Sequence, residues 1–369
     1  MRSTGVAVRD VASVIETLAP LAYQEGYDNA GLIIGDPNMQ VTGVLVTLDV
    51  VPATIDEAIA SGANLIVAHH PVIFSGLKRI TGRNYVEQVV IKAIQANIAI
   101  YAAHTNLDSV PFGVNSRIAD IIGLTHQRVL DPLENQLVKL AVFVPAEQAE
   151  PVRGAMFSAG AGSIGNYDCC SFNLAGTGTF RAGKGANPFV GAVGEVHAEA
   201  EVRVEVIVPK AHLAAVVSAM KEAHPYEEVA YDLYPLLNAF SKVGLGIVGD
   251  LPNPMGESEF LQMIKERFGA KLVRTSPLLE KEISRVALCG GSGASLLGKA
   301  IAAGAQVFVS ADFKYHQFFD ADNKIVIADI GHYESEQFTM DIFCEYLSKK
   351  IPNFAVLKTK HITNPINYF

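Results

Sequence analysis

The amino-acid sequence predicts an α/β protein: two similar α/β lobes, related by internal duplication, with an α+β domain inserted between them. Three observations support this prediction. A segment of the first third recurs in the last third, the predicted strands of both parts are uninterrupted apolar runs, and the middle of the chain alternates apolar with charged residues. The chain of 369 residues is long enough for two or three domains. We place the lobes at residues 1–129 and 241–369 and the insert at 130–240.

The repeat pairs residues 57–70 with residues 299–312 without a gap. Each copy reads as the end of a helix, a glycine turn and a short buried strand. A second apolar strand follows each copy, at 98–103 and at 325–330, which is typical of a largely parallel sheet covered by helices on both faces. Two Ala-rich helix–strand units can also resemble each other by chance, and the sequence leaves that alternative open. The identical residues are Ala58, Ile59, Ala60, Gly62, Ala63 and Val67, with counterparts at 300, 301, 302, 304, 305 and 309.

The middle of the chain has a different pattern. Val202, Val204 and Val206 alternate with charged residues, which indicates a strand buried on one face only. Working outward, the pattern predicts strands at 137–144, 171–180, 202–208 and 230–236, and helices at 147–159 and 211–223. This βαββαβ order is ferredoxin-like. We therefore expect a self-contained domain with a Gly/Pro-rich loop at 182–194.

The composition argues against several classes of protein. The first residues show no basic stretch followed by an apolar core, and polar residues interrupt every long apolar run, so we expect no signal peptide and no membrane helix. The cysteines at 169, 170, 289 and 344 match neither a zinc ribbon nor a disulfide framework, which favours a reduced, cytoplasmic protein. A net charge of −9 without a Lys/Arg cluster makes nucleic acid an improbable partner. The negative net charge does not exclude a small anionic substrate that is held by a metal.

Four segments place polar, ligand-type residues directly after apolar strands. His69-His70-Pro71 and His104–Asp108 follow strands of the first lobe, and residues 312–316 and 331–336 follow strands of the second. Ligands of open α/β sheets bind beyond the carboxyl ends of strands, so these segments are candidates for one site. Two alternatives remain: the His pair can be a plain surface pair beside a turn, and Asp108 can be an N-cap or Asx-turn residue.

His332 and Glu336 are four residues apart, so a helix beginning near Gly331 would present both on one face. The helix dipole explains a glutamate in the first turn but disfavours a cationic His332, whereas a neutral, metal-bound imidazole fits. The candidate ligands are His69, His70, Asp108, His332 and Glu336. They are too few for two closed sites and suit two ions, about 3.5–4 Å apart, that share a bridging carboxylate. Mixed imidazole and carboxylate ligation is compatible with Zn, Fe, Mn, Co or Ni.

Two further segments have ordinary explanations. Cys289–Gly293 can cradle an anion in its backbone N–H groups, although a tight strand–helix turn is the better explanation. Asp28–Leu32 looks structural.

These motifs together resemble the Nif-three-like dinuclear metal centre proteins, also named GTP cyclohydrolase I type 2 homologues. The matching segments follow the family's order in both lobes, and the insert, with His224–Glu228, looks like the CutA/PII-like domain of the longer bacterial members. The segments that carry the resemblance are Tyr27–Leu32, Ala68–Pro71, His104–Asp108, Ala311–His316 and Gly331–Glu336.

The resemblance implies two divalent metal ions per chain. His70 and Asp108 would hold one ion, His69 and His332 the other, and Glu336 would bridge them. It also implies a toroidal homohexamer. The groups expected near the metals, as supporting or acid–base residues, are His104, Lys314 and His316. His316 can instead be hydrogen-bonded to Asp312 or to the backbone without a catalytic role.

Two functions remain open from the sequence. The first is a metal-dependent hydrolase similar to GTP cyclohydrolase I type 2, in which a metal-activated water attacks an electrophilic carbon or phosphorus of GTP or a related nucleotide or phosphoester. His316 or His104 would move protons. The alternative is a non-catalytic hexamer that binds metal or a small ligand, with the insert as a regulatory module.

Overall fold

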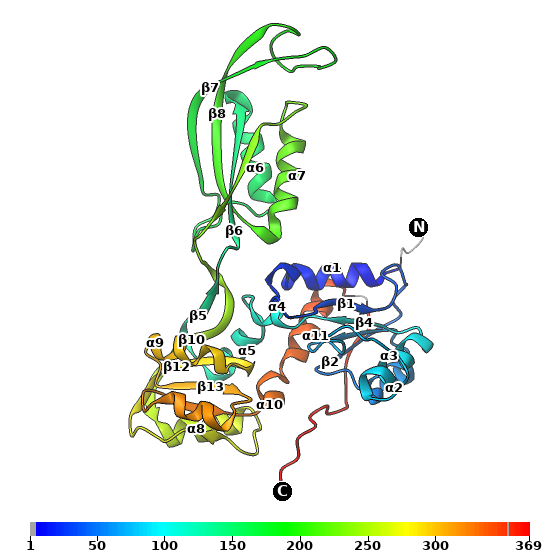
Figure 1. The fold of residues 1–369 in the computed structure, drawn as a ribbon, viewed down its shortest axis with the longest axis vertical. Coiled ribbons are helices and arrows are strands. Elements are labelled where there is room, and N and C mark those ends of the chain that lie inside the picture. Colours follow the sequence, from blue (N-terminus) through cyan, green and yellow to red (C-terminus); the bar gives the residue numbers. More distant parts are fainter. Residues whose placement is uncertain (1–4, 353) are drawn as a thin grey trace. The chain divides into compact units, whose positions relative to one another are not determined.

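The computed structural model describes residues 5–352 and 354–369, and the chain divides into two compact units. Unit 1 combines the residues up to Pro132 with those from Lys242 onward, so it contains both ends of the described chain (Figure 1). Unit 2 comprises Leu133–Ser241. The structure is a mixed α/β fold with three sheets, in agreement with the predicted class.

A five-stranded sheet forms one half of unit 1, in the order β1-β4-β3-β2-β15. Strands β4, β3, β2 and β15 run in parallel, and β1 is antiparallel at the edge. Helices α2 and α3 pack on one face around Ile66 and Ile100, and α1 and α11 lie on the other (Figure 1). The bounds are β1 Gly31–Ile34, β2 Val44–Thr47, β3 Leu65–Ala68, β4 Ala99–Ala102, β15 Val356–Lys358, α1 Val8–Leu18, α2 Pro52–Ser61, α3 Tyr85–Gln95 and α11 Thr339–Lys350.

Strand β15 comes from the end of the chain but pairs with β2. The segment predicted as the second lobe therefore also contributes a strand to the first sheet. Pattern alone gave no sign of this crossing, because a three-residue strand carries almost no periodicity.

A six-stranded sheet forms the other half of unit 1, in the order β11-β14-β13-β12-β10-β5. Strands β12, β13 and β14 are parallel, and helix α9 packs against Phe308 and Ile327 on one face. The strand bounds are β5 Thr125–Leu133, β10 Phe240–Gly256, β11 Arg274–Thr275, β12 Glu282–Ser292, β13 Val307–Ala311 and β14 Val326–Asp329. The helix bounds are α4 Thr105–Asp108, α5 Val114–Ile122, α8 Glu257–Arg267, α9 Leu297–Ala302 and α10 His332–Glu336, with short 3-10 turns at Leu21–Tyr23, Ala294–Leu296 (η4) and Tyr315–Ala321 (η5).

The two copies of the repeated segment adopt the same local structure. Each begins in a helix, α2 or α9, and turns at a glycine with positive φ, +73° at Gly62 and +75° at Gly304. Each then enters a fully buried strand, β3 or β13, that lies between two parallel neighbours. The glycine is required because an L side chain is strained at such φ values.

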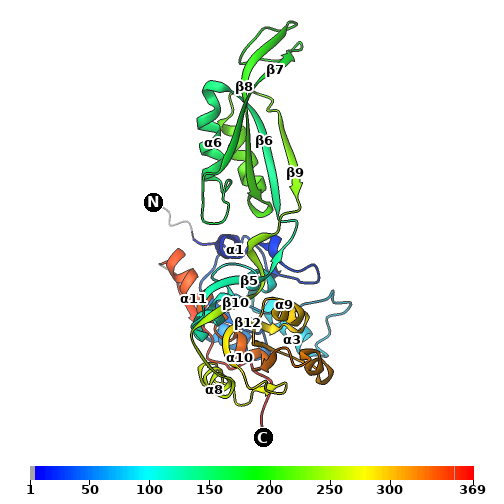
Figure 2. The same ribbon diagram turned by 90° about the vertical axis from the view of Figure 1, so that its left-hand side faces the viewer.

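Unit 2 is a four-stranded antiparallel sheet in the order β7-β8-β6-β9. Helices α6 and α7 lie side by side on one face and bury a Val- and Met-rich core (Figures 1 and 2). Each element predicted for this part of the chain has an observed counterpart, although β8 begins six residues earlier than predicted, at Val196 rather than at 202. The bounds are β6 Leu137–Pro145, α6 Ala149–Ser158, β7 Ser171–Arg181, β8 Val196–Pro209, α7 Leu213–Ala223 and β9 Tyr231–Leu236, with 3-10 turns at Ala146–Gln148 and Lys210–His212.

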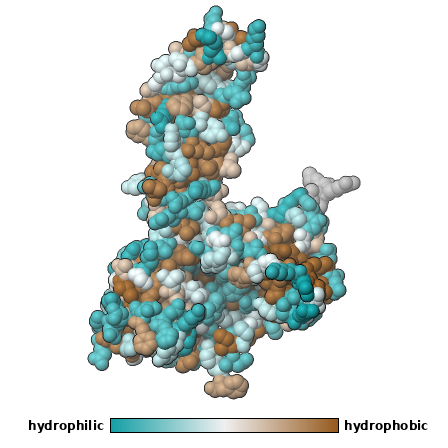
Figure 3. Space-filling view, viewed as in Figure 1, coloured by the Kyte–Doolittle hydropathy of each residue, from teal (hydrophilic) through white to brown (hydrophobic). Residues whose placement is uncertain are grey.

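The surface carries hydrophilic residues over much of the face seen in Figure 3, and the apolar residues there form separate patches. Among the described residues, none of the helices has the length and apolar character needed to span a membrane.

Candidate metal centre

The candidate ligands come from the carboxyl ends of strands in both sheets of unit 1. His69 and His70 directly follow β3, and Asp108 ends α4, the short helix after β4. His332 and Glu336 occupy the two ends of α10, which follows β14. This is where ligand sites form in open α/β sheets.

Their ligand atoms converge on one carboxylate oxygen, Glu336 Oε2. This oxygen lies 3.0 Å from His70 Nε2, 3.0 Å from His332 Nε2 and 3.7 Å from His69 Nε2. The Nε2 atoms of His70 and His332 are 3.3 Å apart, and His69 Nε2 is 3.7 Å from Asp108 Oδ1. The distances therefore group His70 with His332 and His69 with Asp108, with Glu336 beside both pairs. The family resemblance pairs these residues differently, and its pairing stays a prediction.

Each of the three imidazoles is oriented through its other ring nitrogen. The Nδ1 atoms donate to oxygens, that of His69 to the Ala103 carbonyl (3.0 Å), that of His70 to Asp49 Oδ1 (2.7 Å) and that of His332 to Asp312 Oδ2 (2.6 Å). Because these oxygens only accept, Nδ1 carries the hydrogen, and in a neutral ring the Nε2 lone pair is free. Outer hydrogen bonds of this kind are typical of metal-ligating histidines.

Two buried atoms of the cluster lack a partner of the kind that a cation would supply. His69 Nε2 and Asp108 Oδ1 are buried and have no hydrogen-bond partner in the described structure. Unpaired buried acceptors are costly, and a cation between them satisfies both. Two ligand atoms that each lie about 2.0–2.2 Å from one ion are about 3–4 Å apart. The 3.7 Å separation of His69 and Asp108 and the 3.3 Å separation of His70 and His332 both match that requirement.

The pKa shifts follow from burial and close contact. Burial alone would lower the pKa of His70, but its hydrogen bonds to Asp49 and Glu336 raise the pKa to about 9. For His332, burial is likewise outweighed by Asp312 and Glu336, and the pKa rises to about 11. Burial and the charge of Glu336 raise the pKa of Asp108. The surrounding histidines hold the pKa of Glu336 well below its usual range despite its burial.

His104 is the one predicted acid–base residue that the structure brings to the cluster. Its ring centroid lies 5.2 Å from that of His69 and 5.4 Å from that of His70. Its Nδ1 donates to Asp28 Oδ1 at 2.8 Å. Asp28 also accepts from the Thr105 amide and hydroxyl. Burial raises the pKa of the Asp28 carboxyl, but the hydrogen bonds from His104 and then Thr105 outweigh it and lower the pKa to about 2. His104 is therefore a fixed imidazole that can move a proton at the edge of the centre.

Lys314 and His316, which the resemblance places near the metals, make no contact with the ligand set among the contacts of the described residues. Strand β13 ends at Ala311, Asp312 has a φ of +56°, and His316 lies in the η5 turn that follows. His316 is exposed and packs against Tyr315 and Phe319, with ring centroids 5.1 and 6.3 Å away. Neither Lys314 nor His316 lines the cavity that contains the cluster.

That cavity has a volume of about 890 Å³. His70, His104, Asp108, His332 and Glu336 are among the residues that line it. The lining also includes residues of the segments after β2 and β3, the start of α3, the end of β12 with η4, and Tyr27, Thr105, Leu245, Thr363 and Pro365.

The glycine-rich end of β12 is better explained as a structural element than as an anion cradle. The amide nitrogens of Gly290 and Gly291 donate to Asn115 Oδ1 and Ser335 Oγ, both at 2.9 Å, and are not free for a ligand. A Cβ on Gly291, whose φ is +58°, would lie 2.3 Å from Glu336 Oε1. The glycine lets the backbone pass directly beside the shared carboxylate.

Sequence reasoning missed the carboxylates that orient the imidazoles. Asp49 is the second residue after the buried strand β2, as His70 is after β3, and that position after an apolar run was the available signal. Asp312 and Asp28 lie in segments that the sequence singled out, but not for this role. Their importance depends on contacts between segments far apart in the chain.

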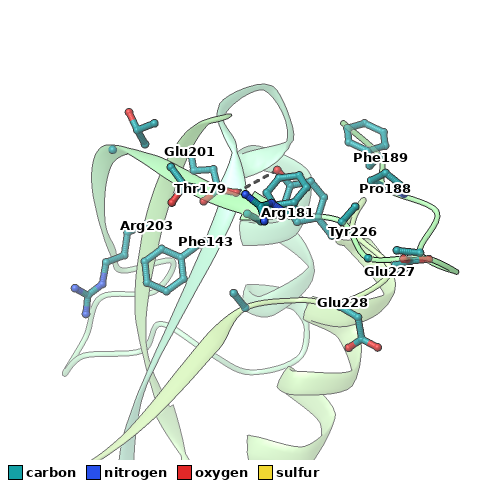
Figure 4. Close-up of a pocket in the computed structure, with 18 of the residues that line it drawn as sticks. Phe143, Thr179, Arg181, Pro188, Phe189, Glu201, Arg203, Tyr226, Glu227 and Glu228 are labelled. Atoms are coloured by element: carbon teal, nitrogen blue, oxygen red, sulfur yellow. Dashed lines mark hydrogen bonds between the residues drawn. The ribbon is translucent and has the colours of Figure 1, made fainter. Parts of the chain in front are cut away.

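Unit 2 has a cavity of its own, of about 640 Å³, on the face of the sheet that the helices leave free. Figure 4 shows Arg181 beside Tyr226, with Phe189 on one side and Phe143 on the other. The Tyr226 hydroxyl donates to Glu201 at 3.1 Å. None of its lining residues belongs to the candidate ligands.

Comparisons with known proteins cover nearly the whole chain. The family model of Duf34/NIF3 (NGG1p interacting factor 3) matches residues 6–365. A "GTP cyclohydrolase 1 type 2 homolog" of Halalkalibacterium halodurans is 43% identical over 324 residues, which are 87% of each protein. A protein of the same name from Bacillus subtilis is 41% identical over 88% of each chain.

Solved structures agree with this similarity. A Bacillus cereus protein related to NIF3 matches over 100% of both chains with a TM-score of 0.88 and 37% identity. The Staphylococcus aureus protein SA1388 matches over 99% of both chains with a TM-score of 0.77 and 28% identity. The similarity therefore includes both units.

Proposed function

Because the chain belongs to the Duf34/NIF3 family, we propose that its buried His/carboxylate centre binds two divalent metal ions and hydrolyses a small-molecule substrate. The family is the one indicated by the sequence motifs. The observation that carries the proposal is the convergence of three Nε2 atoms on Glu336 Oε2, beside the unpaired acceptors of His69 and Asp108. A chance group of surface histidines would not combine rings fixed through Nδ1 with buried, unpaired acceptor atoms at the same place.

In this proposal His69 and Asp108 hold one ion, His70 and His332 hold the other, and Glu336 serves both. The distances support this assignment, since each pair is separated as two ligands of one ion are. Nitrogen and carboxylate ligands suit Zn, Fe, Mn, Co or Ni, and the donor set is compatible with each of them.

The metal ions would supply a water molecule acidified toward neutral pH. The protein's residues perform the other tasks. Asp49 and Asp312 fix the rings of His70 and His332, and Asp28 fixes His104 with its Nδ1 as donor. His104 is then placed to take a proton from the attacking water and return it to the leaving group.

The test is turnover by protein reconstituted with each metal. Hydrolysis is assayed with GTP first, because relatives carry that name, and then with other nucleotides, phosphoesters, amides and esters. A centre that binds two ions and turns over one of these classes supports the hydrolase. Full metal loading without turnover of any class supports the alternative, a protein that binds metal or a small ligand without catalysis.

Metal affinity should rise steeply with pH across the neutral range. With pKa values of about 9 and 11, His70 and His332 are protonated at pH 7 before a cation binds. An ion held by both rings must displace both protons, so its apparent affinity should increase by up to about 100-fold per pH unit until the pH passes the pKa of His70. Competition with a chromophoric chelator between pH 6 and 8.5 measures this slope. A pH-independent affinity would count against ligation by these two rings.

We also propose that unit 2 is an inserted ferredoxin-like domain of the CutA/PII-like kind and that the two halves of unit 1 arose by duplication. The sheet order of unit 2, its two helices on one face, and the matched helix–glycine–strand segments of unit 1 support this interpretation. Replacing residues 133–241 by a short linker should leave a folded protein with its full metal content. A folded deletion variant without metal would show that unit 2 supports the centre.

We further propose, from the resemblance, that the protein is a cytoplasmic homohexamer. Exposed aromatic and aliphatic side chains of unit 1, Tyr315, Phe319 and Ile362 among them, are compatible with contacts between copies. Light scattering coupled to size exclusion gives the mass directly, and a monomer at micromolar concentration would contradict the hexamer.

A further inference from the structure

We propose that the substrate presents an uncharged ester-, amide- or amidine-type carbon to this centre, and not a phosphoryl group. The inference rests on the proposed function, because it concerns the group that would react beside the two ions. It is carried by the balance of charge around the centre and by the residues that line the cavity.

The negative charge of the carboxylates around the centre exceeds the positive charge that two divalent ions would bring. Asp108 and Glu336 belong to the candidate ligand set, two more carboxylates contact its histidines, and a third contacts the neighbouring His104. The outer three are Asp49 on His70, Asp312 on His332 and Asp28 on His104. Five negative charges thus surround four positive ones. A protonated His104 only restores neutrality, so the loaded centre offers no net positive charge.

The residues of the cavity wall do not offset this excess of negative charge. Among the described residues that line the cavity, none is lysine or arginine. The nearest basic residues along the chain, Lys78, Arg79 and Arg83, lie in the exposed segment between β3 and α3 and are not part of the lining. They can contact an anionic tail of a substrate outside the cavity, but not its reacting end.

Phosphoryl transfer needs the opposite arrangement. Its transition state spreads negative charge over three oxygens, and enzymes neutralise that charge with Lys, Arg and metal ions together. Attack of water on an ester or amide carbon develops a single negative charge. A centre without net positive charge meets the second requirement far better than the first.

The hydrolytic step then balances with this chain's residues. Water loses a proton to His104 Nε2 as its oxygen bonds to the carbon. The bond from that carbon to the leaving nitrogen or oxygen breaks, and the proton passes from His104 to the leaving group. An ester or amide gives an acid and an alcohol or amine, an amidine gives an amide and an amine, and no oxidant or further reactant is required.

The apolar side chains beside His104 indicate which kind of substituent the reacting carbon of the substrate carries. Phe74 meets the His104 ring edge to face, with centroids 5.4 Å apart. Ile73, Leu77 and Tyr85 continue an apolar surface along the cavity. Phe74 and Tyr85 are about half exposed, at 51% and 58%, so the surface is available to a ligand. The carbon therefore carries an apolar or planar substituent.

The experiment compares two probes that differ by one charge, phenylphosphonate and its monomethyl ester. At a pH where the first carries two negative charges, the second carries one and resembles the tetrahedral transition state of ester or amide hydrolysis. Their dissociation constants are measured by calorimetry with metal-loaded protein, and the metal content of each sample is determined. We expect the monoester to bind at least as tightly as the dianion. A dianion that binds tenfold more tightly would overturn the inference.

A charge placed in the cavity provides the matched control. Ser295 is exposed and lines the cavity, whereas Ala215 is an exposed residue of α7 in unit 2. Ser295→Lys should increase the affinity for the dianion by about tenfold relative to the monoester, and Ala215→Lys should leave both unchanged. An equal ratio in Ser295→Lys and wild type would contradict the charge argument. Protein that contains no metal and binds neither probe would refute the proposed function itself, and the inference with it.

Discussion

Protein in which alanine replaces Glu336 should retain neither metal ion. Glu336 Oε2 is the atom shared by the two ligand pairs, within 3.0 Å of His70 and His332 and 3.7 Å of His69. Removing it takes a ligand and a negative charge from both ions at once. Metal content should fall from about two ions per chain to near zero, as measured by elemental analysis of protein purified without chelator.

Two variants serve as controls for Glu336→Ala. Glu334 is a second buried glutamate of the same helix, but its carboxylate accepts from Asn364 and makes no contact with the ligand set. Glu334→Ala should keep both ions. His70→Ala should lose mainly the ion shared with His332. Equal, partial loss of metal from the Glu336 and His70 variants would contradict a shared carboxylate.

A methyl group on Gly291 should disrupt metal binding although Gly291 is not a ligand. The new Cβ would lie 2.3 Å from Glu336 Oε1 and 3.1 Å from His332 Cε1, so the carboxylate must move. Displacement of one shared ligand should cost at least the 10–100-fold in affinity, roughly, that is typical of lost support around a metal. Chelator competition with Gly291→Ala measures the loss.

Gly62→Ala separates this contact from backbone strain. Gly62 has a similar positive φ, +73° against +58°, but a Cβ there would meet no atom within 4 Å. Both variants should lose about 1–2 kcal/mol of stability from the left-handed backbone. Only Gly291→Ala should lose metal. Normal metal affinity in Gly291→Ala would show that Glu336 is not held against this turn.

The sequence singled out the side chains that converge on Glu336 because each follows a recognisable local signal, and their role as ligands stays a prediction. His69, His70 and Asp108 follow continuous apolar runs, and the spacing of His332 and Glu336 matches one helical turn. The elements of unit 2 were predictable for the same reason. Alternation in β8 and helical spacing in α7 are both regular and long enough to read.

The features of the site that the sequence pattern could not predict depend on contacts between residues far apart in the chain. The grouping of His70 with His332 is set by how the two halves of unit 1 meet, and no local signal encodes it. Asp49 becomes an orienting group only because Thr363, near the end of the chain, and His70 both contact it. A role for His316 stays a prediction: it lies in the short η5 turn after Asp312 and is not among the residues that line the cavity.

The most direct test of the dinuclear centre is anomalous X-ray diffraction from crystals of zinc-loaded protein. The expected result is two peaks in each chain, one between His69 and Asp108 and one between His70 and His332, both next to Glu336. A single peak, or peaks away from these side chains at full zinc loading, would contradict the account.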